Sequence, residues 1–83
     1  MTIKHGHLEF DTNKVYRISP VIDREVLRNH IVYVKRLTED ACGLAMLLVE
    51  LTTQDAVAKN RLAKQGFEGF ALVPPSFIVP IGR

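Results

Sequence analysis

The sequence predicts a mainly β or α+β domain that carries one short helix at about residues 54–65. Two observations favour this class. Several short runs are rich in apolar and β-branched residues and are separated by turn formers, which is typical of strands. One stretch, "TTQDAVAKNRLAKQG", instead contains helix formers followed by glycine. The chain has 83 residues, of which 47% are hydrophobic, so we expect one small globular domain over residues 1–83.

The first predicted unit is a hairpin in "HLEFDTNKVYRI", at residues 7–18. Apolar residues alternate with polar ones before and after the segment Asp-Thr-Asn-Lys, which tolerates turn geometry. Pro20 then ends the second strand, because proline has no N–H to donate to a ladder. Residues 21–30 fit either a short helical turn that begins near Asp23 or a loop that crosses the sheet.

Two further strands are predicted at residues 31–37 and 44–51. The first run, "IVYVKRL", is rich in β-branched and aromatic residues. The second, "LAMLLVEL", could also begin a helix, since leucine, alanine and methionine are helix formers. Gly43 and Val49 favour a strand, and so does a turn between two apolar runs. We therefore expect residues 44–51 to pair antiparallel with residues 31–37.

The predicted helix has recognisable end signals. Thr52 followed by Asp55 resembles a capping box, with aspartate in place of glutamate. Cations in the second half of the helix suit the negative end of its dipole. Gly66 stands where a left-handed residue commonly ends a helix.

The closing stretch, "GFEGFALVPPSFIVPIGR", predicts a strand at residues 68–73 and a last short strand at residues 78–81. Pro74 and Pro75 end the first of these strands, and Ser76 and Phe77 form a tight turn. Pro80 must lie at an edge or at a ladder end, because it has no N–H. The two adjacent prolines are therefore interpreted as a corner between strands.

This stretch resembles the end of a Src-homology-3-like small β-barrel. In that family a glycine-aromatic strand leads to a proline, a one-turn 3₁₀ segment, an aromatic residue and a β-branched residue. Here Gly69 and Phe70 begin the pattern, and Pro74, Phe77 and Ile78 complete it. The resemblance implies a closed small barrel, or a related compact sheet, with the helix as an insertion. It does not carry over the recognition of proline-rich peptides, because the chain has no tryptophan and Phe77 lacks a tyrosine hydroxyl.

The strand patterns also predict which apolar residues form the core and which remain outside it. We expect eight side chains to be mostly buried, namely Val32, Val34, Leu47, Val49, Phe70, Leu72, Phe77 and Ile78. Met46, Leu48 and the apolar residues 78–81 exceed what one small core can hide. Exposed apolar patches commonly mark interfaces, so a homodimer or higher oligomer is expected.

The composition excludes several classes of function. The net charge is only +2, and the single cysteine, Cys42, cannot form an internal disulfide. Together with a start that lacks an apolar signal core, and with no run long enough to span a membrane, this predicts a cytoplasmic protein without a membrane partner. His5 and His7, joined by His30 and Cys42, are the only metal candidates, and the default interpretation is ordinary solvated side chains.

The sequence contains neither a phosphate-binding loop nor a dinucleotide fingerprint. Two acids precede Cys42 and would disfavour its thiolate. We therefore expect no enzyme and no cofactor. An enzymatic role would require a site at the symmetry axis of an oligomer.

By elimination, the sequence predicts a non-enzymatic module that binds another macromolecule. A protein partner is favoured, because stand-alone domains of this size often act as accessory or inhibitory factors of phages or plasmids. A nucleic-acid-binding small barrel is the alternative. The expected partner-binding surface is a basic rim around an apolar centre, formed by Arg24, Leu27, Arg28, Lys59, Arg61 and Lys64.

Overall fold

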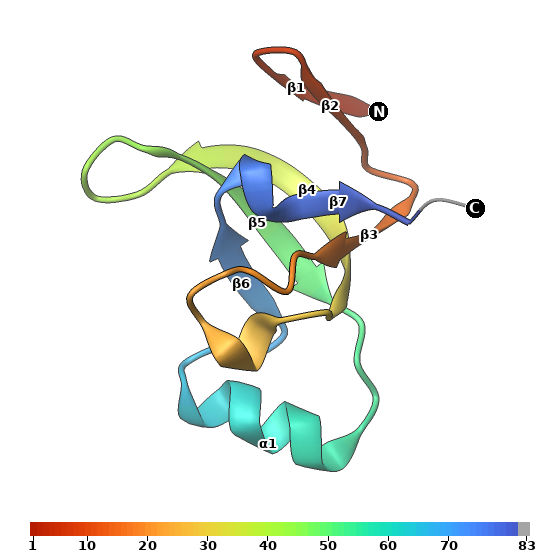
Figure 1. Ribbon diagram of the computed structural model, residues 1–83, viewed down its shortest axis with the longest axis vertical. Coiled ribbons are helices and arrows are strands. Elements are labelled where there is room, and N and C mark those ends of the chain that lie inside the picture. The colour runs from red at the N-terminus through yellow and green to blue at the C-terminus, as the bar shows by residue number, and fades with distance from the viewer. Residues whose placement is uncertain (82–83) are drawn as a thin grey trace.

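A computed structural model describes residues 1–81, and its centre is a five-stranded antiparallel sheet (Figure 1). The sheet contains β3 (Val15–Ile18), β4 (Ile31–Glu39), β5 (Ala45–Leu51), β6 (Phe70–Val73) and β7 (Ile78–Pro80). The strand order is β6-β5-β4-β3-β7, so β6 and β7 are the two edges. The remaining elements are a hairpin of β1 (Thr2–His5) and β2 (Leu8–Asp11), one helix α1 (Ala56–Lys64), and two single 3₁₀ turns, η1 (Glu25–Leu27) and η2 (Pro75–Phe77). The predicted mainly β fold with one short helix is confirmed.

The predicted hairpin at residues 7–18 is wrong in its pairing. β2 pairs with β1, across a turn in which Gly6 has a φ of +61°. β3 pairs instead with β4 and β7. The turn that was predicted at Asp11 does form, with the Asp11 carboxylate accepting a hydrogen bond from the Asn13 N–H at 2.9 Å. It sends the chain from the hairpin into the sheet rather than back along β2 (Figure 1).

The hairpin is joined to the sheet at Tyr16. The Tyr16 hydroxyl accepts a hydrogen bond from the Asp11 N–H at 2.7 Å, and its ring lies edge-on to Phe10 with 5.6 Å between the ring centroids. Both aromatic residues are buried. The hairpin is therefore attached to the core through its second strand.

The predicted pairing of the two central strands is confirmed. β4 and β5 are antiparallel, with Val34 opposite Val49, and a register shift follows Val34. The tip of this hairpin is closed by Asp40, whose carboxylate accepts hydrogen bonds from the backbone N–H groups of Cys42 and Leu44, both at 2.9 Å. This pairing excludes the helical alternative for residues 44–51.

The helix is capped differently from the prediction. Asp55 is the N-cap, and its side chain accepts a hydrogen bond from the Ala58 N–H at 2.8 Å. The Thr52 hydroxyl instead donates a hydrogen bond to the Ile31 carbonyl at 2.7 Å, so the predicted capping box is wrong. The helix end follows the prediction, since Gly66 has a φ of +89°.

We expect Asp55→Ala to lower the free energy of unfolding by about 0.5–2 kcal/mol, the usual cost of removing a capping side chain. Denaturant titration followed by circular dichroism measures this change. Gln54→Ala, at the exposed neighbouring position, is the matched control and should change stability by less than about 0.5 kcal/mol. Equal losses in the two variants would show that the cap contributes nothing.

The last two strands lie at opposite edges of the sheet, joined by η2. The Phe77 N–H donates to the Pro74 carbonyl at 3.0 Å, which closes the predicted single turn. β7 then pairs with β3, and Pro80 lies opposite Tyr16 at the end of an edge strand, as predicted. Among residues 1–81, β6 and β7 form no ladder with each other, so the predicted closure into a barrel is not observed. The corner is present, but it carries β7 away from β6 to the far edge.

The predicted core is correct on β4, β5 and β7 and wrong on β6. Val32, Val34, Leu47, Val49 and Ile78 are all buried. On β6, Phe70 is 48% exposed and Leu72 is 41% exposed, whereas Ala71 and Val73 are buried. Phe77 is only half-buried against the core. Because Leu47 pairs with Val73 and Val49 with Ala71, the register places the smaller residues of β6 inward.

Candidate functional site

The structure brings together four of the six residues predicted to bind a partner. η1 packs against α1, so the cations of the two segments meet. Arg24, Arg28, Arg61 and Lys64 line a surface depression of about 650 Å³, together with Asp23, Glu25, Val26 and Gln65. We call this depression the basic hollow. The convergence follows the prediction that the two basic segments flank one site.

The other two predicted residues lie outside this hollow. Lys59 lines a different depression, beside Thr53 and Glu68. Leu27, predicted as part of the apolar centre, lines the apolar groove described below, but it is 1% exposed and belongs to the core, so it presents almost no surface to a partner. The single turn η1 directs Leu27 into the core and leaves its charged neighbours, Glu25 and Arg28, outside.

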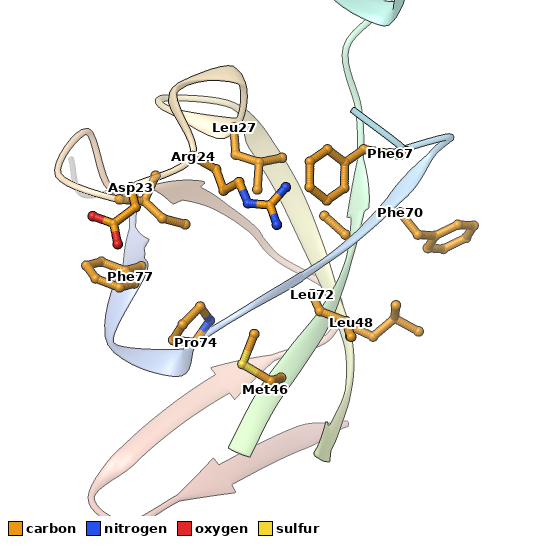
Figure 2. Close-up of a pocket in the computed structure, with 13 residues that line it drawn as sticks. Asp23, Arg24, Leu27, Met46, Leu48, Phe67, Phe70, Leu72, Pro74 and Phe77 are labelled. Atoms are coloured by element: carbon orange, nitrogen blue, oxygen red, sulfur yellow. The ribbon is translucent and has the colours of Figure 1, made fainter. Parts of the chain in front are cut away.

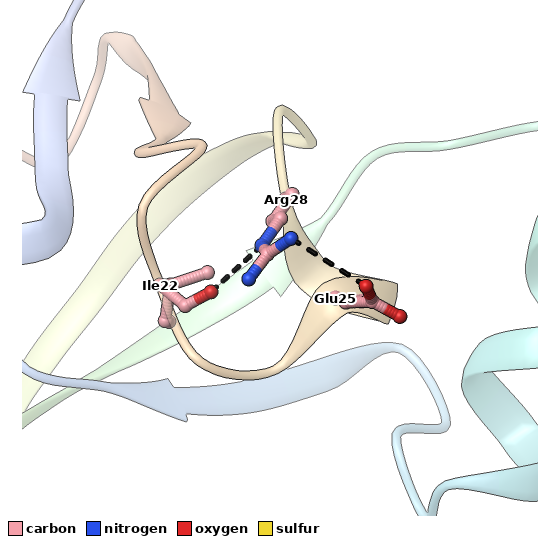
Figure 3. Close-up of polar contacts among 3 residues, drawn as sticks. All are labelled: Ile22, Glu25 and Arg28. Atoms are coloured by element: carbon pink, nitrogen blue, oxygen red, sulfur yellow. Dashed lines mark hydrogen bonds and ion pairs between the residues drawn. The ribbon is translucent and has the colours of Figure 1, made fainter.

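Arg28 is held in place by two interactions (Figure 3). Its Nε donates a hydrogen bond to the Ile22 carbonyl at 2.8 Å, and its Nη1 lies 3.7 Å from a carboxylate oxygen of Glu25. Arg28 therefore braces the segment that bears Asp23 and Arg24. Since Glu25 offsets part of its charge, Arg24, Arg61 and Lys64 remain the freer cations of the hollow.

A mainly apolar groove of about 530 Å³ adjoins the basic hollow (Figure 2). Its walls come from β5, β6, η2, residues 22–27 and residues 66–67 after α1. The side chains that make it apolar are Met46, Leu48, Phe67, Phe70, Leu72 and Phe77. None of these six is fully buried, so the groove presents a substantial apolar surface. We call it the apolar groove.

Arg24 links the two depressions. Together with Asp23 it lines both the groove and the hollow. Its guanidinium carbon lies 5.6 Å from the centroid of the Phe67 ring, a cation–π contact. Figure 2 shows the arginine extending beside this ring at the wall of the groove. The apolar and basic surfaces are therefore continuous.

The sequence indicated some residues of the apolar groove but not the groove itself. Met46 and Leu48 were expected to exceed the core, and Leu27 was expected in an apolar centre; all three line the groove. Phe67 had a local signal. Gly66 donates its N–H to the Ala63 carbonyl, and Phe67 donates its N–H to the Leu62 carbonyl. This is the Schellman pattern of a helix end, in which the residue after the glycine often makes a hydrophobic contact. The sequence "KQGF" therefore indicated that Phe67 would pack beside α1.

The residues considered as metal ligands are not gathered by the fold. Among residues 1–81, no group of three or more histidine, cysteine, aspartate or glutamate side chains is arranged to hold a metal ion. His5 and His7 lie at the β1–β2 turn, and Cys42 lies at the exposed tip between β4 and β5. The basic hollow and the apolar groove are therefore the surfaces interpreted below.

Comparisons with protein-family models, with curated proteins and with solved structures give no match to this chain. Within residues 1–81, no helix has both the length and the apolar character needed to cross a membrane. The interpretation of the site therefore rests on its geometry and chemistry.

Proposed function

We propose that this chain is a non-enzymatic binding module for another protein. The observation that carries the proposal is the continuity of the apolar groove with the basic hollow at Arg24. Protein interfaces commonly combine a desolvated apolar centre with a polar rim. Here the groove would supply the centre, and the cations of the hollow would supply the rim.

The charges of the rim define the partner. Four cations and two acids, Asp23 and Glu25, line the basic hollow. An acidic residue on the partner would meet this excess of positive charge, and adjacent apolar side chains would enter the groove. The partner is therefore a protein segment that combines apolar side chains with aspartate or glutamate. An accessory or inhibitory factor that acts by such contacts is the role we infer.

Nucleic acid is the less favoured partner. The same cations could contact phosphates, but Asp23 and Glu25 lie among them and would repel phosphate groups. The apolar groove would also find no match in a duplex backbone. The two partners differ in salt dependence, because release of counterions makes phosphate binding fall steeply as salt rises.

The single turn η2 supports the proposed relationship to Src-homology-3-like barrels. Pro74 precedes the turn, Phe77 ends it, and Ile78 begins the last strand, in the order expected of that family's end. We propose this relationship for the fold. The chain lacks tryptophan, so we do not infer that it binds proline-rich peptides.

We expect Arg61→Glu combined with Lys64→Glu to slow association with acidic ligands. The probe is a displayed library of random twelve-residue peptides, from which binders to the unaltered chain are selected. Enriched peptides should combine apolar residues with aspartate or glutamate. At low salt, the double variant should bind them with an association rate constant at least about fivefold lower, because opposite charge accelerates encounter. Surface plasmon resonance measures the rate.

The matched control is Lys14→Glu combined with Arg17→Glu, which makes the same change of net charge at exposed positions outside both depressions. It should leave most of the association rate intact. Equal rates for the unaltered chain and the Arg61/Lys64 variant would contradict the proposal. Steeply salt-dependent binding to a DNA duplex, without peptide selection, would favour nucleic acid instead.

A further inference from the structure

β6 is an edge strand that lacks the usual protection against pairing. Natural sheet edges are commonly protected by charged side chains, proline or bulges. The opposite edge, β7, ends in Pro80. β6 is Phe-Ala-Leu-Val, without a charge or a proline, and it pairs on one side only, with β5. Its other side can therefore accept a further strand.

The register of β6 defines which backbone groups face outward. Leu51 donates its N–H to the Gly69 carbonyl at 2.9 Å, so Gly69 faces β5. Backbone groups alternate in direction along a strand, and Ala71 and Val73 therefore face β5 as well. The N–H and C=O groups of Phe70 and Leu72 point to the free edge. Among residues 1–81, none of the hydrogen bonds formed outside the ladders uses these groups.

The apolar groove lies along this same edge. Phe70, Ala71, Leu72 and Pro74 all line it, and Figure 2 shows β6 passing between the groove side chains. Phe70 begins the strand, three residues after Phe67, whose ring contacts Arg24. A chain placed along the edge would therefore have backbone partners, apolar side-chain sites and cations near one end.

We propose, on the basis of the protein-binding function above, that the partner segment binds in extended form as an added strand on β6. Its backbone hydrogen-bonds to the N–H and C=O groups of Phe70 and Leu72. Strand addition of this kind draws affinity from main-chain bonds and specificity from alternate side chains. The partner's alternate apolar side chains enter the apolar groove, and its acidic residue lies at the Phe70 end, opposite Arg24 and the basic hollow.

Charge decides between a foreign segment and a second copy of this chain. A second β6 contains no acidic residue. In an antiparallel self-pairing, Glu68 of the second copy, which precedes its Phe70, would lie at the Val73 end, so the cations near the Phe70 end would stay unmatched. A short uncharged edge of four residues also offers much less contact than a stable dimer usually buries, which is roughly 800 Å² on each partner. An acidic segment from another protein fits both the edge and the hollow.

An N-methyl scan of a peptide selected from the library tests the geometry. Each residue in turn is synthesised with a methyl group on its backbone nitrogen, which removes one hydrogen-bond donor. If the peptide adds to β6, affinity should fall at least about tenfold at every second residue of the central segment, and change by less than about threefold between them. A loss without this alternation would overturn the proposal.

Leu72→Pro tests the same geometry from the protein side. The substitution removes an N–H that points to the free edge, and proline is tolerated at such positions of edge strands. We expect peptide affinity to fall at least about tenfold, with the thermal unfolding transition retained. Leu72→Ala keeps the N–H and is the control for the lost side chain, so it should bind more tightly than Leu72→Pro. Should Leu72→Pro fail to fold, the N-methyl scan decides.

The outcomes separate this inference from the proposed function. Suppose that the Arg61/Lys64 reversals slow binding, but that Leu72→Pro leaves peptide affinity unchanged and the N-methyl scan shows no alternation. The module then binds protein in another way, and the proposed added strand is wrong. If analytical ultracentrifugation shows that the unaltered chain is a dimer and that Leu72→Pro is a monomer, a second copy occupies the β6 edge and the inference is overturned. If the library yields no binder, both proposals fail.

Discussion

Leu27→Ala is expected to lower the free energy of unfolding by about 2–5 kcal/mol, the range for a leucine removed from a packed core. Leu27 is 1% exposed and belongs to the same buried cluster as Ile18, Ile22 and Val32. A chain of this size has a total stability of roughly 4–12 kcal/mol. The substitution therefore removes a large part of it, and the loss is measured by urea titration with circular dichroism.

Leu44→Ala is the matched control, because Leu44 is 64% exposed at the tip between β4 and β5. It should change stability by less than about 0.5 kcal/mol. A small effect of Leu27→Ala combined with a faster release of bound peptide would mean that Leu27 contacts the partner. That result would support the sequence-based prediction that Leu27 binds the partner, and it would contradict the burial of Leu27 in the core.

Leu62→Ala is expected to lower the free energy of unfolding by a similar amount, about 2–5 kcal/mol. Leu62 is the buried residue of α1, and it is 2% exposed. The other residues of the helix are alanine, polar or charged, apart from the exposed Val57, so its attachment to the sheet depends mainly on Leu62. We also expect the amide groups of α1 to exchange with deuterium faster than those of β4 and β5, as hydrogen-exchange mass spectrometry would show.

Val57→Ala separates packing from helix propensity. Val57 lies on the same helix and is 61% exposed, so its truncation removes little buried surface. Alanine is also the better helix former, and stability should stay the same or rise slightly. Equal losses at Leu62 and Val57 would mean that α1 does not pack through Leu62.

Local signals in the sequence predicted the elements well. The strands β4 and β5 are β-branched or apolar runs joined by a short turn. Because they are neighbours in the sequence, their pairing with each other could be predicted. The helix was predicted from the polar pair Thr52 and Asp55 before it and from Gly66 after it, although Asp55 rather than Thr52 is the N-cap. The N-terminal pairing failed for the opposite reason. β3 has partners far away in the sequence, and a turn at Asp11 does not specify which strand follows it in the sheet.

The inward face of β6 illustrates a second limit. Phe70 and Leu72 are larger and more apolar than Ala71, so residue type alone favoured them as core residues. In a strand, however, a shift of one residue exchanges the two faces. The Leu51–Gly69 hydrogen bond sets that register, and Gly69 has a φ of +90°. The pairing with β5, which begins beside Gly69, therefore determines which residues of β6 line the apolar groove.

The sequence indicated more of the charges of the candidate site than of its apolar part. Of the five predicted cations, Arg24, Arg28, Arg61 and Lys64 line one hollow, whereas Lys59 lines another depression. The groove depends on tertiary contacts among β5, β6, η2, residues 22–27 and residues 66–67. The pattern of apolar residues within one segment cannot predict contacts between segments that are distant in the sequence.

The pairing of β3 with β7 also affects how the protein folds during its synthesis. Residues 16–18 of β3 lie opposite residues 78–80 of β7, so one side of β3 stays without a partner until residues 78–80 have left the ribosome. Contacts so distant in sequence slow folding, because a long loop must close before they form. The β4–β5 hairpin can form earlier from local contacts. We therefore expect the nascent chain to acquire this hairpin first and to complete its sheet only once β7 has emerged.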